Sequence, residues 1–193
     1  HQAGFLRPGD ALTVDTGFDL VRAWHDVSES PTLVQEIVLP RGTGPRHIVR
    51  HASGSLFLVT EYSCEVYVLA QDAGGTWHIV SSTPVAPGIP DGDAAAGITT
   101  SVRGEFVYVG VRGSNAIATL RVGDGGRTLA PVALADSGVD WPRCHLTAGD
   151  DVLVAGQRSN DIVALNIDDR TGVVGGVRAR TQAPSPTSLL PIA

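Results

Sequence analysis

The 193-residue chain carries a net charge of −6 and 42% hydrophobic residues, so it can form a core but shows no basic stripe. That balance argues against a nucleic-acid binder, which normally has clustered Lys and Arg. No stretch approaches the roughly 20 consecutive apolar residues that span a membrane. No signal peptide is visible. We therefore expect neither a nucleic acid nor a membrane as partner, and we expect a cytoplasmic protein.

Glycine and proline punctuate the sequence throughout, with 23 glycines and 12 prolines. This is the composition of a turn-rich all-β protein. Cys64 and Cys144 lie far apart and outside any CxxC pair, which predicts two free, partly buried thiols. Because the chain lacks methionine and begins with His1, we expect a fragment or a processed product rather than a translation start.

Four segments repeat one pattern along the chain, at residues 6–24, 51–69, 101–120 and 147–165. Each contains a turn glycine, then a strand with alternating apolar residues, a polar turn and a second apolar strand. The turn glycines are Gly9, Gly54, Gly104 and Gly149. Three positions after each glycine stand Leu12, Phe57, Val107 and Val152, and five positions after stand Val14, Val59, Val109 and Val154. The alternation predicts strands with one face more buried than the other.

Further short strands are predicted after tight turns, at residues 77–80, 128–129 and 173–174. Roughly four strands per unit of about 45 residues is typical of a β-propeller blade. A β-sandwich is the alternative, but it does not require strand groups to repeat at a fixed period. We predict an all-β propeller, with about four blades at residues 1–44, 45–92, 93–140 and 141–193. Trp24, Trp77 and Trp141, in different blades, are expected to pack between sheets.

Several motifs resemble the lactonase family of seven-bladed propellers, which includes 6-phosphogluconolactonases and carboxy-muconate cyclases. Gly44-Pro45-Arg46-His47, followed by FLVTE at 57–61, is similar to the family's GPRH…(Y/F)-x-V-x-E stretch. The stretches FVYVGVRG at 106–113, WPR at 141–143 and LVAGQ at 153–157 resemble its YVSNRG, G-x-x-PR and L-x-VANQ elements. The resemblance covers nearly the whole chain. It implies the C-terminal part of a seven-bladed ring, with roughly three blades preceding His1.

Polar residues occupy matching positions of neighbouring blades, where inner strands line a shared channel. His1 and Arg46 stand eight residues before their turn glycines, and Arg143 falls near the same place. On the following strand the matching positions hold Glu61, Arg112 and Gln157. Guanidinium groups suit a carboxylate, a phosphate or a developing oxyanion. This pattern favours a small anionic ligand, such as a lactone or sugar acid.

The family resemblance implies His1, Arg46, Glu61 and Arg112 as a catalytic set. Glu61 or His1 would activate water and the arginines would stabilise the oxyanion of a lactone under hydrolysis. Arg143, His145 and Gln157 are the substrate-binding candidates. We expect no cofactor and see no metal-spaced cluster. A related cycloisomerase activity fits the same resemblance.

Structural alternatives stand beside these assignments. One alternative is that Glu61 forms only a structural ion pair between blades, with Arg46 or Arg112. For His145 two positions are open: it faces the channel or fills a blade interface. Two departures from the family also matter: Gly97 stands where a Glu is usual, and Val111 replaces an Asn. They favour the alternative function, a non-catalytic platform for ligands or proteins. The sheets at the ends of the array are expected to meet the missing N-terminal blades or a second copy of the chain.

Overall fold

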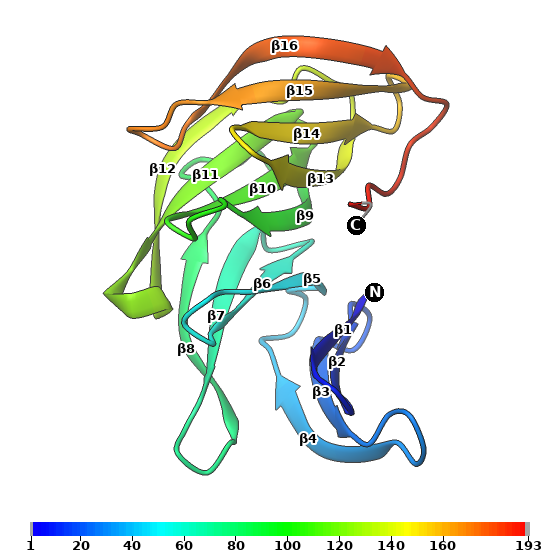
Figure 1. The fold of residues 1–193 in the computed structure, drawn as a ribbon, viewed down its shortest axis with the longest axis vertical. Coiled ribbons are helices and arrows are strands. Elements are labelled where there is room, and N and C mark those ends of the chain that lie inside the picture. The colour runs from blue at the N-terminus through cyan, green and yellow to red at the C-terminus, as the bar shows by residue number, and fades with distance from the viewer. Residues whose placement is uncertain (1, 192–193) are drawn as a thin grey trace.

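A computed structural model describes residues 2–191 as four antiparallel sheets, each made of four consecutive strands (Figure 1). The first sheet contains β1 (Gln2–Arg7), β2 (Asp10–Asp15), β3 (Leu20–His25) and β4 (Thr32–Val38). The second contains β5 (Pro45–Arg50), β6 (Leu56–Thr60), β7 (Glu65–Gln71) and β8 (Trp77–Pro84). The third contains β9 (Ala94–Thr100), β10 (Phe106–Arg112), β11 (Ala116–Gly123) and β12 (Thr128–Asp136), with the short 3-10 turn η1 (Asp124–Gly126) between the last two. The fourth contains β13 (Pro142–Ala148), β14 (Asp151–Gly156), β15 (Asp161–Ile167) and β16 (Val174–Gln182).

The sheets follow one another around an arc in chain order, as propeller blades do (Figure 1). Strands β1, β5, β9 and β13 form the inner side of the arc, while β4, β8, β12 and β16 lie outside. Within the described residues, no helix has the length and apolar character to cross a bilayer. The predicted all-β propeller is thus confirmed, and both cysteines are free.

The turn glycine of each repeat joins the innermost strand of a blade to its second strand. Gly9, Gly54, Gly104 and Gly149 have φ values of 85°, 92°, 75° and 60°. Glycine adopts this left-handed region readily because it has no Cβ. The recurrence of glycine therefore reflects the same tight turn, made once in every blade.

Three hydrophobic clusters fill the spaces between consecutive blades. Leu12, Val21 and Leu58 belong to the cluster of the first and second blades, and Phe57 with Val107 to that of the second and third. Strands β6 and β10 are buried along their whole lengths. We expected strands with one face more buried than the other. That expectation is wrong for β6 and β10, because a neighbouring blade covers each of their two faces.

A β-bulge interrupts the innermost strand near the start of the second and fourth blades. The pairing of β5 with β6 shifts between Pro45 and His47, and that of β13 with β14 shifts between Pro142 and Cys144. The residues left unpaired are Arg46 and Arg143. Bulges re-aim side chains, and they are common beside active sites. The inner ends of these blades thus present arginines by the same backbone device.

Candidate functional site

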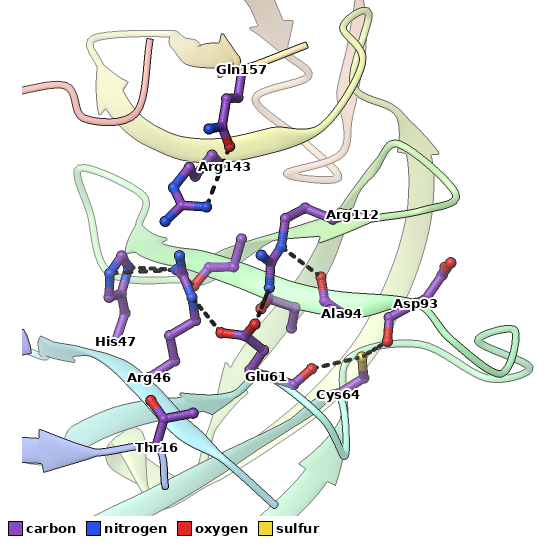
Figure 2. A network of polar contacts seen from close by, with 12 residues as sticks. Thr16, Arg46, His47, Glu61, Cys64, Asp93, Ala94, Arg112, Arg143 and Gln157 are labelled. Carbon is purple, nitrogen blue, oxygen red and sulfur yellow. Dashed lines mark hydrogen bonds and ion pairs between the residues drawn. The ribbon is translucent and has the colours of Figure 1, made fainter. Parts of the chain in front are cut away.

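Glu61 lies between two arginines at the inner ends of the second and third blades (Figure 2). Its Oε2 is 2.8 Å from Nε of Arg46, and its Oε1 is 2.8 Å from Nη2 of Arg112. The side chains of Arg46 and Arg112 are 8% and 6% exposed, against 22% for Glu61. A carboxylate of one blade therefore joins an arginine of its own blade to an arginine of the next.

Strand β9 supplies further acceptors for both guanidinium groups. Nη1 of Arg46 donates to the carbonyl of Ala96 at 2.6 Å, and Arg112 donates to the carbonyls of Ala94 and Ala95 at 3.3 and 3.1 Å. Charge-assisted hydrogen bonds of this kind compensate the burial of a guanidinium. Both arginines are consequently fixed in orientation.

The backbone at Glu61 is tied to both neighbouring inner strands. Its N–H donates to the carbonyl of Gly44 at 2.6 Å, and its carbonyl accepts from the N–H of Ala95 at 3.0 Å. Glu61 directly follows β6, so the end of that strand and these two bonds set the direction of its side chain. The site is built on strand ends rather than on a long loop.

Two opposing effects act on the pKa of Glu61. Burial alone would raise it, but the hydrogen bonds and charges of Arg112 and Arg46 outweigh burial and hold the pKa below its ordinary value. For Arg46, burial and the nearby charge of Arg112 lower the pKa, and Glu61 opposes them. Since both carboxylate oxygens are engaged, Glu61 is an ionised partner of the arginines and a weak acceptor of protons.

Arg143 and His47 complete the polar group. Nη1 of Arg143, on β13, donates to the amide oxygen of Gln157 at 3.3 Å (Figure 2). Nη1 of Arg46 lies 3.4 Å from each ring nitrogen of His47. Burial, followed by the charge of Arg46, lowers the pKa of His47 to about 3. His47 is therefore a neutral imidazole at neutral pH.

The group offers more positive than negative charge. Arg46, Arg112 and Arg143 come from the second, third and fourth blades. Glu61 is the carboxylate paired with the first two, and Gln157, the partner of Arg143, is neutral. Planar guanidinium groups match carboxylates and phosphates through paired hydrogen bonds. This arrangement is suited to binding a small anion and to stabilising negative charge that develops on an oxygen.

Comparison with known proteins decides the family. The sequence model described as "Lactonase, 7-bladed beta-propeller" matches residues 1–191. The chain belongs to this lactonase family. An uncharacterized protein of Staphylococcus saprophyticus is 29% identical to this lactonase-family chain over 168 residues, which is 86% of the chain and 48% of that relative.

Solved structures share the fold of this lactonase-family chain. A Lactobacillus plantarum protein matches with a TM-score of 0.89 and 23% identity, over 97% of this chain and 57% of that protein. The periplasmic gluconolactonase PpgL of Pseudomonas aeruginosa matches with a TM-score of 0.87 and 26% identity, over 97% and 55% of the two chains. The chain spans about half the length of the curated relatives it matches.

The structure brings together five of the residues singled out in the lactonase-family sequence. Arg46, Glu61 and Arg112 form the ion-paired group, and Arg143 with Gln157 lies beside it (Figure 2). His1 lies outside the described residues. The ion pair between blades, the structural alternative for Glu61, is present in the fold.

His145 is buried in the interface of the third and fourth blades. It is 5% exposed, and its Nε2 donates to the carbonyl of Tyr108 at 3.0 Å. Its ring faces Gly97 and Gly110, where an added Cβ would lie 3.1 and 3.3 Å from Nδ1. This burial fits the blade-interface role that the sequence left open for His145, and its role in substrate binding stays a prediction.

The two departures from the family pattern have different structural settings. A side chain at Gly97 would point at the ring of His145, so the imidazole takes the space that a longer residue needs. Val111 is fully buried in the cluster between the second and third blades. Neither position reaches the arginines through its own side chain, so the ion-paired group is intact despite both changes.

Two residues beside the arginines were not predicted from the sequence to belong to the site. No role in the site was predicted for His47, although it follows Arg46 directly. Trp141 was expected to pack between sheets, as Trp77 does in the cluster of the first and second blades. Its ring instead lies 5.5 Å from the guanidinium carbon of Arg112. The sequence position of Trp141 could have indicated this location. Trp141 precedes Pro142-Arg143 just as Gly44 precedes Pro45-Arg46 in the second blade.

Proposed function

We propose that the chain forms part of a lactone-ring hydrolase that acts on a small anionic lactone of a sugar or acid. The observation that carries the proposal is a surplus of guanidinium groups: three successive blades contribute Arg46, Arg112 and Arg143, and the one carboxylate paired with the first two is Glu61. The likeness to a gluconolactonase at 26% identity supports the same class of substrate.

The reaction adds water to the lactone carbonyl carbon and breaks the ring C–O bond, giving a hydroxy acid. Negative charge develops on the carbonyl oxygen, where fixed guanidinium donors lower the barrier. Arg46 and Arg112 are the fixed donors, because Glu61 and the β9 carbonyls hold them. Arg143, whose partner is a neutral amide, is assigned to the acidic group of the substrate.

Water requires a proton acceptor, and the described residues offer the neutral imidazole of His47. Its pKa is lowered by burial and by the charge of Arg46. An anionic substrate beside the arginines offsets the charge of Arg46, the second cause of that shift, and so increases the proton affinity of His47. The sequence proposed Glu61 or His1 as the base; both oxygens of Glu61 are engaged by arginines, and His1 lies outside the described residues.

The test incubates the purified protein with 6-phosphogluconolactone and with simple sugar lactones, and follows acid release at constant pH. We expect hydrolysis above the buffer rate and a loss of about 10²- to 10³-fold in kcat for Arg112→Ala. Arg121→Ala is the control, because this exposed arginine of β11 lies over Phe106 rather than in the site. Ring opening no faster than in buffer, unchanged by Arg112→Ala, would sink the proposal.

A second candidate function is a non-catalytic platform that binds small anions. The observation favouring it is that both oxygens of Glu61 are occupied by arginines. On this hypothesis 6-phosphogluconate binds, measured by calorimetry, while no lactone is turned over. Turnover that Glu61→Gln abolishes would exclude it.

A further inference from the structure

Trp141 adopts a backbone conformation that bulky residues rarely take. Its φ is 65°, in the left-handed region, and it directly precedes Pro142. A Cβ makes this region unfavourable, and a following proline favours an extended conformation instead. Such an outlier persists only where the surrounding structure fixes it, and it marks a position whose side chain is worth explaining.

The second blade has the same turn with a glycine. Gly44 has a φ of 67° and precedes Pro45-Arg46, as Trp141 precedes Pro142-Arg143. At Gly44 the ring of Tyr62 occupies the place that a Cβ would take. The turn itself thus needs only a glycine, so the backbone does not explain a tryptophan in the fourth blade.

Two guanidinium groups lie over the indole of Trp141. The guanidinium carbon of Arg158 is 3.4 Å from the ring centroid, and that of Arg112 is 5.5 Å away. Both distances are within the range of cation–π attraction. Arg112 is the buried partner of Glu61, whereas Arg158 is exposed. The ring therefore contacts an exposed arginine and also lies within cation–π range of the arginine that holds Glu61.

Hydrogen bonds fix the backbone of Trp141 from two blades. Its N–H donates to Oδ1 of Asn115 at 2.9 Å, and its carbonyl accepts from the N–H of Gln157 at 3.1 Å. Asn115 is itself held, since its amide donates to Asp140 at 3.0 Å. The position of the indole is thus set by Asn115, in the turn after β10, and by Gln157, which follows β14. Gln157 also accepts a hydrogen bond from Arg143 through its side chain.

We propose that Trp141 is a positioning residue, which holds the guanidinium of Arg112 against Glu61 and thereby couples the fourth blade to the ion-paired group. This role rests on the proposed hydrolase function. Trp141 is assigned no contact with substrate, because the groups recorded over its ring are the guanidinium groups of Arg112 and Arg158.

The kinetic test compares Trp141→Gly and Trp141→Phe in the purified protein. Trp141→Gly recreates the second-blade turn, and we expect kcat to fall about tenfold with KM changed less than kcat. Trp141→Phe keeps a ring and should lose less. In an Arg112→Lys background the further effect of Trp141→Gly should disappear, because the two residues act through one contact. Trp24→Phe, in the first blade, is the matched control and should leave kcat unchanged.

If Trp141→Gly lowers kcat by the same factor in the wild-type and Arg112→Lys backgrounds, the proposal is overturned. A second readout needs no turnover: the carboxyl carbon of Glu61, titrated by ¹³C NMR. We expect the pKa of Glu61 to rise toward its ordinary value in Trp141→Gly, and an unchanged pKa contradicts the coupling. A protein that hydrolyses no lactone, yet shows this rise, refutes the proposed function and leaves the role of Trp141 standing.

Discussion

Two imidazoles, the buried ring of His145 and the partly buried ring of His47, distinguish the inner region of this chain at the residue scale. Burial lowers the pKa of His145 to about 4, and burial with the charge of Arg46 lowers that of His47 to about 3. Both rings are neutral in the folded protein near pH 7. The neutral ring of His145 packs in an interface between blades. The neutral ring of His47 lies beside the arginines, where it is available as a proton acceptor.

Stability should therefore fall on mild acidification. Between the ordinary histidine pKa of 6.5 and the lowered folded values, the unfolded chain binds protons that the folded chain does not. The contribution of His145, roughly 3 kcal/mol, is fully present above pH 6.5 and is lost as the pH falls toward 4. Urea unfolding at steps of pH measures it.

His145→Gln is the informative variant for this pH dependence, because its amide can still donate to the carbonyl of Tyr108. We expect a flatter dependence of unfolding free energy on pH between 6.5 and 4. The slope that remains should shrink again on adding His47→Gln. A slope unaltered by both substitutions would contradict the assignment.

At the scale of single elements, turns and bulges decide where the functional side chains stand. The turn glycines close each inner hairpin, and the bulges in β5 and β13 turn Arg46 and Arg143 out of the regular ladder. The second and fourth blades deliver Arg46 and Arg143 to one region by the same local irregularity, whereas Arg112 of the third blade stands at the regular end of β10. The location of a residue at a bulge or strand end therefore decides whether its side chain reaches the site, more than its preference for β-strands does.

Two glycines of this chain allow the backbone strain of a turn to be measured separately from steric contacts. Gly54 has a φ of 92° and Gly176 has no such restriction, yet neither has a heavy atom within 4 Å of an added Cβ. Gly54→Ala should lower the free energy of unfolding by about 1 kcal/mol through backbone strain alone. Gly176→Ala should be neutral or slightly stabilising. Equal effects of the two substitutions in chemical denaturation would show that the turn does not require glycine.

Across the whole molecule, the cores lie between blades rather than within them. Phe57 of β6 and Val109 of β10 are both fully buried in one cluster, and the ion pair of Glu61 with Arg112 crosses the same interface. Between the described strands, the main contacts from blade to blade join consecutive blades, as in other repeat architectures. Stability is consequently a property of adjacent blade pairs.

Phe57→Ala tests this coupling. Removing the ring should lower the free energy of unfolding by about 3–5 kcal/mol. Hydrogen exchange should accelerate in β10 and β11 of the third blade as well as in β6, because the lost contacts are shared. Val177→Ala, at a 42% exposed position of β16, is the control and should have a small effect. Protection lost in the second blade alone would refute the shared core.

Much of the candidate site could be anticipated from matching positions in the repeats. Arg46, Glu61 and Arg112 were singled out because equivalent residues of successive blades converge, and the ion pairs bear out their proximity. The sequence left two positions open for His145, because both a channel and a blade interface accept an imidazole at that register, and the fold buries it in the blade interface. Trp141 was missed because its role depends on a left-handed turn and on two arginines distant in sequence.

The sequence by itself determined the repeat, the four inner turns and the family, because periodic glycines and apolar residues record local backbone geometry and burial. The tertiary structure decided which faces are covered, that both oxygens of Glu61 are taken, and that the place beside Gly97 belongs to His145. These outcomes depend on how separate blades pack against one another. Packing of that kind joins residues tens of positions apart, and no local pattern encodes it.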